Sequence, residues 1–264
     1  MNWSHKGSSR HDGAVEVKRP QGGGRRRAGD RETLAAIIFV ATSGCTWRQL
    51  PPVFGPAWPT VYRRFAQWSR DRVWVRLHRV VLDELDSRGE LDWSRCAIDS
   101  VSGPGLKRGP LTGPNPTDRG KLGSKIHLVT DRSGLPLSLG MSGANMHDSL
   151  GLQPLVRGIP PVRSRRGPRR RRPAKLHADK GYDYDHLRKW LRERGIRHRI
   201  ARKGNESSTR LGRYRWVVDR TVSWLAGCRR LHRRYEQKPE HFLAFVGLAA
   251  FLIGYRRLTR TVRA

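Results

Sequence analysis

Three aspartates, Asp99, Asp179 and Asp219, have the chemistry and the placement for metal-dependent work on a phosphate ester. Asp99 follows the apolar run CAI and Asp179 follows LHA. Each therefore ends a predicted strand, where side chains of an open α/β sheet point into the ligand-binding crevice. Asp219 lies in RYRWVVDRTVSWL, residues 213–225, which has a helical pattern. Carboxylates bind Mg²⁺ or Mn²⁺, and two such ions can activate a water or hydroxyl and stabilise a leaving oxygen, so the order strand, strand, helix predicts phosphodiester cleavage.

Each aspartate taken alone also has a simpler interpretation. An aspartate that ends a strand is often a turn residue or a helix N-cap. Asp219 lies four residues after Arg215, and such a pair on an exposed helix face contributes only a few tenths of a kcal/mol. The three residues alone leave these alternatives open.

The elements that must position the aspartates follow from the change in sequence pattern near residue 94. Short β-like runs alternate with helical patterns, which predicts a mixed α/β sheet with helices on its faces. A helix signal begins at Asp148, and a long apolar helix closes the core. The predicted strands are 95–101, 124–131, 135–143, 174–179 and 196–201, and the predicted helices include 184–194, 213–225 and 239–256.

The residues before this sheet predict a flexible basic arm over 1–29 and a helical region over 30–90. The first helix begins near Asp30 and ends at Gly44, and TWRQ at 46–49 has the form of a capping box. A helix near Pro59 has an apolar face, and a further helix carries Trp74, Leu77, Val81 and Leu85. Arg63, Arg64 and Arg70 are expected to point away from the apolar face and to contact DNA, as in a helix-turn-helix-like module, although a solvated basic face explains them too.

The charge of the chain favours a nucleic-acid partner. There are 54 Lys and Arg against 22 Asp and Glu, a formal charge of +32, and the pI is near 11.6. Such a charge attracts polyanions, and the Arg-rich loop at 162–173 is expected to contact phosphate or to be merely solvated. The apolar run 242–255 is shorter than the roughly 20 residues of a membrane span, so no membrane partner is expected. The N-terminus has no secretion signal and the three cysteines lack zinc-site spacing, which favours an intracellular protein.

Seven segments carry a resemblance to a known family: GCTWRQLP, AIDS, DRGKLGSKIHLVTDRSGLPLSL, GANMHDS, HADKGYD, RWVVDR and RRLHRRYE. They resemble those of bacterial insertion-sequence transposases of the DDE type, in the group of insertion sequence 5. The resemblance runs from about residue 25 to 258, and residues 1–24 lack the opening helix that is usual in this family. It implies an RNase H-like catalytic domain over 91–258, preceded by a small all-α DNA-binding region.

The resemblance also implies the roles of single residues. Asp99 and Asp179 match the first two catalytic acids, and Asp219 occupies the place of the usual glutamate, four residues after a matched arginine, Arg215. The implied activity is cutting and joining of double-stranded DNA at terminal inverted repeats with Mg²⁺ or Mn²⁺, two ions in all, in the bacterial cytoplasm at the nucleoid. A homodimer is expected because an element has two ends that must be brought together. Because aspartate is shorter than glutamate, the alternative is a decayed transposase that binds DNA without cutting it. Contacts to DNA or to the third acid are expected from Lys125, Lys180, Arg215 and Arg220, whereas Trp216 and Trp224 are interpreted as core residues.

Overall fold

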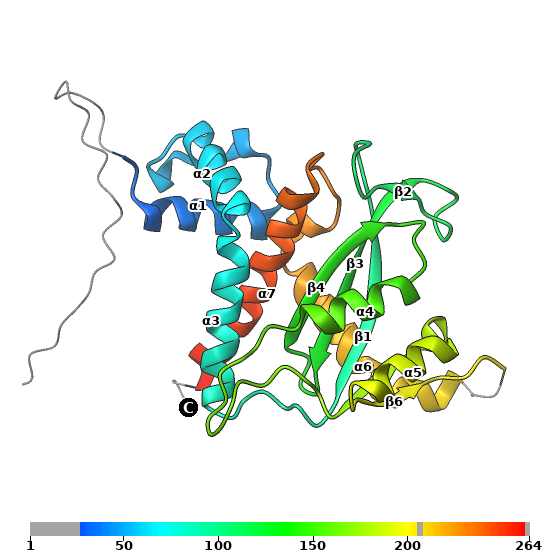
Figure 1. Cartoon of the computed structure of the whole chain (residues 1–264). Coiled ribbons are helices and arrows are strands. Elements are labelled where there is room, and N and C mark those ends of the chain that lie inside the picture. Colours follow the sequence, from blue (N-terminus) through cyan, green and yellow to red (C-terminus); the bar gives the residue numbers. More distant parts are fainter. Residues whose placement is uncertain (1–26, 205–207, 262–264) are drawn as a thin grey trace, which may run out of the picture.

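The computed structural model describes residues 27–204 and 208–261, and within 208–215 only the backbone is described. A mixed sheet forms its centre (Figure 1). Strand order is β2-β3-β1-β5-β6, with β4 on the far side of β3; β1, β3 and β4 are antiparallel, whereas β5 and β6 run parallel to β1. The bounds are β1 Cys96–Pro104, β2 Gly113–Pro114, β3 Leu122–Asp131, β4 Pro136–Gly143, β5 Lys175–Ala178 and β6 Arg197–Ile200. Each of the five predicted strands is confirmed.

The hairpin between β3 and β4 turns at Asp131, as its sequence predicts. The Asp131 carboxylate accepts hydrogen bonds from the backbone N–H groups of Ser133 and Leu135, at 2.8 and 2.7 Å. Gly134 supplies the left-handed backbone that the turn requires, with a φ of 87°. Burial raises the pKa of Asp131 to about 6, although these N–H donors favour the ionised form. The turn fixes the register of the two strands that follow β1 in the sheet.

Helices cover both faces of the sheet. On one face the α4 residue Gly151 packs against His127 of β3, and on the other the α6 residue Val218 packs against Ala97 and Leu128. The long helix α7 lies beside β4 and packs along α3. The helices are α1 Asp30–Ser43, α2 Trp58–Arg70, α3 Val73–Ser87, α4 Ser149–Gly158, α5 Asp185–Glu193, α6 Ser208–Ala226 and α7 Pro239–Thr261, with short 3₁₀ turns at η1 Trp47–Gln49, η2 Pro52–Phe54, η3 Lys180–Tyr182 and η4 Arg229–Leu231.

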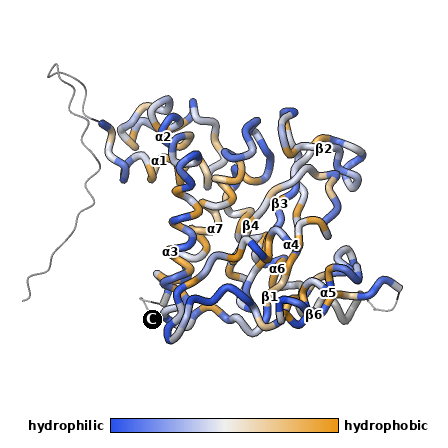
Figure 2. Tube along the Cα trace, in the orientation of Figure 1, coloured by the Kyte–Doolittle hydropathy of each residue, from blue (hydrophilic) through white to orange (hydrophobic). Residues whose placement is uncertain are grey.

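The helical region before the sheet shares its core with the rest of the chain. Phe65 of α2 stacks on Phe245 of α7 with ring centroids 4.5 Å apart, and both belong to the cluster that also contains Ile98 and Leu176 of the sheet. Figure 2 shows the apolar residues gathered on α7 and the strands, where these parts meet. The predicted division at residue 90 therefore marks a change of secondary structure, and the apolar core runs across it.

Arg64 corrects the predicted orientation of α2. Its side chain is only 9% exposed, forms an ion pair with Asp30 of α1, and lies 5.7 Å from the centre of the Trp68 ring. Arg64 follows Val61 by three residues and precedes Trp68 by four, so helical spacing places it on the buried face. The prediction that Arg64 points to solvent is wrong, whereas Arg63 and Arg70 are exposed as predicted.

Helix α7 is longer than its apolar run suggested. By length and composition alone, Pro239–Arg260 meets the requirements of a membrane-spanning helix. However, 61% of its most apolar window is buried inside the fold, where it packs on α3. That burial identifies it as a core helix.

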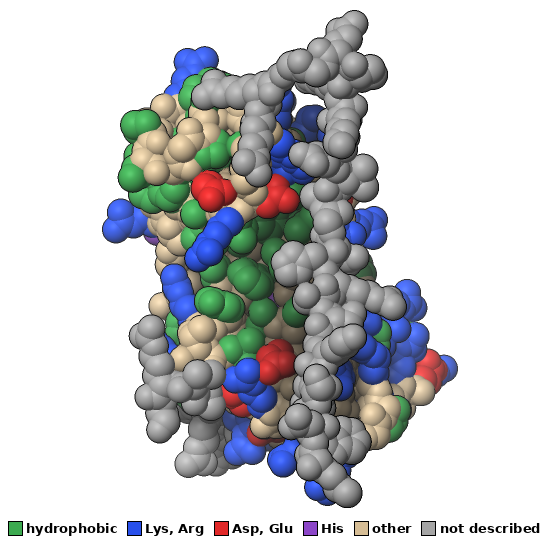
Figure 3. All heavy atoms as spheres, turned by 90° about the vertical axis from the view of Figure 1, so that its left-hand side faces the viewer, with side chains coloured by type: hydrophobic (Ala, Val, Ile, Leu, Met, Phe, Trp, Pro, Cys, Tyr) green, Lys and Arg blue, Asp and Glu red, His purple; other side chains and the backbone are tan. Residues whose placement is uncertain are grey.

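The face that carries α3 is partly apolar. Figure 3 shows a band of hydrophobic side chains there, bordered by Lys and Arg. On α3 itself, Val75 and Val80 are 61% and 64% exposed. Trp74 and Leu82 of the same helix are buried.

Candidate active site

Asp99 and Asp179 lie at the same level on neighbouring parallel strands. The register of β1 and β5 pairs Cys96 with Leu176 and Ala97 with His177, and both aspartates follow two residues later. Side chains alternate along a strand, so both aspartates share the sheet face of Ala97, which is the face that α6 covers. The sheet thus brings together two of the three predicted acids, and both are half-buried.

Asp179 also begins the turn that follows β5. Its Oδ1 accepts a hydrogen bond of 2.9 Å from the backbone N–H of Gly181, which makes it the N-cap of η3. The turn or N-cap interpretation of Asp179 is therefore confirmed, and its other carboxylate oxygen does not take part in this cap. The next residue, Lys180, is exposed at the same edge, as its predicted phosphate contact requires.

Asp219 is on the helix that covers this face, but it is exposed. The neighbouring Val217 and Val218 turn toward the sheet and are almost fully buried. Among residues 27–204 and 208–261, no three His, Cys, Asp or Glu side chains lie close enough to hold one metal ion together. The structure therefore pairs Asp99 with Asp179 and leaves Asp219 outside a three-acid group.

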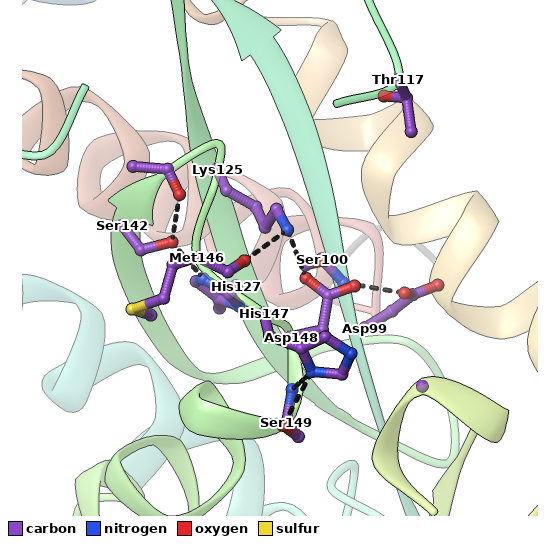
Figure 4. A network of polar contacts seen from close by, with 12 residues as sticks. Asp99, Ser100, Thr117, Lys125, His127, Ser142, Met146, His147, Asp148 and Ser149 are labelled. Carbon is purple, nitrogen blue, oxygen red and sulfur yellow. Dashed lines mark hydrogen bonds and ion pairs between the residues drawn. The ribbon is translucent and has the colours of Figure 1, made fainter. Parts of the chain in front are cut away.

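Lys125 is buried and holds a different acid from those predicted. Its Nζ lies 2.7 Å from Asp148 and donates a 2.8 Å hydrogen bond to the carbonyl of Met146 (Figure 4). Burial opposes ionisation of Asp148, but hydrogen bonds from Lys125 and Ser100 outweigh it and lower the pKa of Asp148. Ser100 in turn donates its backbone N–H to Asp99 over 2.8 Å. Lys125, which was expected to contact DNA, therefore braces the strand that carries Asp99.

The residue before Asp148, His147, lies just ahead of α4 and contacts the segment that follows η3. His147 is exposed, and its ring lies 5.7 Å from that of Tyr184, which follows η3. Its Nδ1 is 2.8 Å from the Ser149 hydroxyl and accepts from the Ser149 backbone N–H at 3.3 Å. The GANMHDS segment thus places two polar side chains beside the Asp99 and Asp179 edge, and sequence reasoning treated Asp148 only as an N-cap.

Arg220 is occupied within the fold. It donates to the carbonyl of Ser133, and its guanidinium lies 4.5 and 4.8 Å from the ring centres of Trp216 and Trp224. Those tryptophans are 51% and 37% exposed, so their interpretation as core residues is wrong. Arg220 ties α6 to the β3–β4 turn, and the side chain of Arg215 lies outside the described part of the chain.

The donor set fits a divalent ion in part. Mg²⁺ in proteins is commonly bound by one or two carboxylates together with substrate phosphates and water. Asp99 and Asp179, side by side on one sheet face, supply two hard oxygen ligands of this kind. A centre that needs a third carboxylate from Asp219 does not match its exposed position.

Comparison with known protein families identifies the family of this chain. A family described as the transposase DDE domain matches residues 94–253, and one described as transposase of the IS4/5 family matches residues 14–78. The transposase for insertion sequence element IS402 of Burkholderia cepacia is 47% identical over 230 residues, covering 87% of this chain and 96% of that protein. The chain belongs to the IS4/5 family of DDE transposases.

Two further matches are more distant. The transposase for insertion sequence element IS1106 of Neisseria meningitidis is 29% identical over 140 residues, covering 49% of this chain and 43% of that protein. A piggyBac transposase synaptic complex with hairpin DNA covers 93% of this chain and 70% of its own, with 10% identity and a TM-score of 0.48. The family and the mixed sheet together confirm the predicted RNase H-like fold, and a DDE domain implies the use of divalent metal.

Proposed function

We propose that this transposase binds the terminal inverted repeats of an insertion sequence and catalyses DNA strand cleavage and strand transfer at the edge formed by Asp99 and Asp179. The register of β1 and β5 carries the proposal, because it aligns these two acids on one sheet face in a chain of the DDE family. Asp99 and Asp179 would hold Mg²⁺ or Mn²⁺, two ions in all, which would lower the pKa of the attacking hydroxyl and stabilise the leaving oxygen.

The remaining residues in the proposal bind and orient the DNA. Lys180 is exposed beside Asp179, where its ammonium group neutralises a phosphate near the cut. Arg63 and Arg70 on the exposed side of α2 contact the duplex backbone within the region 30–90. The buried pair of Lys125 and Asp148 keeps Asp99 in place through Ser100.

The decisive test is a cleavage assay on a labelled duplex that carries the element ends, with Mg²⁺, Mn²⁺ or EDTA. Asp99→Asn and Asp179→Asn should each abolish metal-dependent nicking while the affinity for the duplex is kept or increased. Glu193→Gln, which alters an exposed carboxylate on α5, is the matched control and should cut normally. Nicking by either aspartate variant would overturn the assignment.

A second candidate function, end binding without cutting, is favoured by the exposed position of Asp219 outside a three-acid group. Asp219→Glu separates the two candidates, because it restores the longer side chain that this family usually has. Cleavage that appears only in Asp219→Glu means that the present chain is a DNA-binding remnant. Equal cleavage in both proteins means that aspartate suffices.

The proposal includes assembly as a homodimer at the bacterial nucleoid, because an element has two ends that must be brought together. The mass of the protein–DNA complex, measured by light scattering with one-end and paired-end duplexes, tests this part. Two chains on paired ends support it, and a single chain bound to each separate end contradicts it.

A further inference from the structure

The segment between β1 and β3, residues 105–121, is a long loop that contains only the two-residue strand β2. Its seventeen residues, GLKRGPLTGPNPTDRGK, exceed the usual length of a connection in a compact domain. Long loops of this kind are commonly functional. In Figure 1 this loop extends beyond the sheet at the end of β1.

A buried arginine from a distant segment of the chain anchors the loop through hydrogen bonds. Arg234 is only 2% exposed, and its guanidinium donates 2.9 Å hydrogen bonds to the carbonyls of Pro110 and Leu111. It also donates to the Ser124 hydroxyl at 2.8 Å, and its backbone N–H bonds to the carbonyl of Pro104 at 2.9 Å. The base of the loop is therefore fixed to the RRLHRRYE segment.

Two glycines allow the loop to pack closely on both sides. A Cβ at Gly109 would lie 2.8 Å from the carbonyl oxygen of Gln237. A Cβ at Gly113 would lie 1.9 Å from Oδ1 of Asn145, in the GANMHDS segment beside the candidate active site. The loop is thus clamped between the 234–237 segment and Asn145.

The backbone of the loop is strained where its side chains are exposed. Leu111 and Arg119 have φ values of 58° and 50°, a left-handed conformation that costs about 1–2 kcal/mol for a residue with a Cβ. Leu111 is nevertheless 46% exposed, so burial of its side chain does not explain the strain. Strain that the surroundings enforce is typical of ligand-binding segments.

The exposed surface of the loop carries basic side chains together with two apolar ones. Its four basic residues are exposed, and Asp118 is its sole acid. Leu106 and Leu111 are 53% and 46% exposed beside them. Phosphate-binding cations together with an apolar side chain that can enter a groove are typical of proteins that grip duplex DNA. The basic residues are Lys107, Arg108, Arg119 and Lys121.

We propose that residues 105–121 form a preformed DNA-contact lobe, in which the four cations bind backbone phosphates and Leu111 lies against a groove. The expectation that this lobe prefers element-end DNA rests on the proposed function. Five residues of β1 separate Asp99 from Pro104, which corresponds to about 17 Å along the strand. That is roughly half a turn of B-form DNA, so one duplex can reach both the acids and the lobe.

Site-specific crosslinking of the full chain tests the lobe. Leu111→Cys carrying a benzophenone maleimide should crosslink to a labelled element-end duplex on illumination, at least tenfold more than Val80→Cys, whose exposed aliphatic position on α3 is the matched control. The unsubstituted protein gives the background from Cys45, which is half-buried, and from the buried Cys96 and Cys228. Crosslinks from Leu111→Cys to a second protein chain, or equal yields at positions 111 and 80, would overturn the lobe.

Repeating the crosslinking experiment with a random duplex of equal length tests the lobe and the proposed function independently of each other. Crosslinking at position 111 on both duplexes, with no preference for element ends, supports the lobe and contradicts end recognition. Preferential binding of element ends without crosslinking at position 111 supports end recognition and contradicts the lobe.

Discussion

Two basic loops of this transposase use their cations in opposite ways. In the Arg-rich loop 162–173, Arg169 binds both carboxylate oxygens of Asp83 at 3.1 Å, and Arg171 and Arg172 donate to backbone carbonyls at 3.0 Å. In the loop 105–121 the guanidinium donors come from Arg234, outside the loop. The loop's own cations are exposed, and one of them, Lys121, forms an ion pair with Asp118 at 3.7 Å. The loop with more arginines therefore uses more of them in contacts within the protein.

This difference shows why charge alone does not identify a DNA surface. A guanidinium has five donors and readily satisfies carbonyls that a Pro- and Gly-rich loop leaves without partners. The arginine run therefore ties α3 and the α5 end to the strands, and sequence reasoning expected it to contact phosphate or to be solvated. We expect the two loops to differ in their contributions to stability and to DNA binding, as their contacts indicate.

The largest expected effect is on the anchor of the loop 105–121. Arg234→Ala removes the donors of four hydrogen bonds whose surroundings are buried or partly buried, and an unsatisfied buried group costs about 1–3 kcal/mol. We expect the free energy of unfolding to fall by roughly 3 kcal/mol or more. Thermal and urea unfolding measure it, with the exposed neighbour variant Arg233→Ala as control. Equal stability of the two variants would contradict the anchoring role.

The next effect concerns the packing of the loop against Asn145. Gly113→Ala places a methyl group where the Asn145 side chain lies, and overpacking of this kind costs about 1–3 kcal/mol. Asn145→Ala in the same chain removes the clash, so the double variant should recover most of the stability. A double-mutant cycle by urea unfolding checks this, and strictly additive effects would show that the two residues do not touch.

The same contrast shows what the sequence could predict. The strands were predictable because their apolar runs are short and bounded by turn residues such as Gly134, and the alignment of Asp99 with Asp179 follows from two parallel strands that end together. Arg64 was predictable too, since its spacing to Val61 and Trp68 places it on the buried face, but its charge favoured the wrong interpretation.

Contacts between distant segments were not predictable in this way. Arg234 and its acceptors at Pro110 and Leu111 are separated by more than 120 residues, and no local pattern links them. The pair of Lys125 and Asp148 joins a strand to a helix start, where the periodicity of each element gives no sign of the other. The position of Asp219 depends on the rotation of α6 about its axis, which is set by packing of Val217 and Val218.

A third effect, of moderate size, is expected in DNA binding, where substitutions in the two loops should change the salt dependence of the binding constant differently. Removing the cation that neutralises one phosphate lowers the slope of log K against log salt by about 0.9. Lys107→Gln with Arg108→Gln should therefore reduce the slope by about 2. Arg171→Gln with Arg172→Gln should change it little, because these arginines already bind carbonyls. Fluorescence anisotropy with an element-end duplex from 50 to about 200 mM salt measures both slopes. Equal reductions would mean that composition alone sets the DNA surface.

The smallest expected effect is on the ion pair of the Arg-rich loop. Arg169 is 46% exposed and Asp83 is 23% exposed, so solvent screening limits the pair to about 1 kcal/mol or less. Arg169→Ala should lower the free energy of unfolding by no more than that. Asp83→Ala should cost more, because Asp83 also accepts the backbone N–H of Arg163 at 2.5 Å. Urea unfolding of both single variants and of the double variant measures which substitution lowers the free energy of unfolding more. If Arg169→Ala lowered the free energy of unfolding as much as Arg234→Ala, the arginine run would be as strongly anchored as the loop 105–121. The two loops would then not differ in how their cations are used.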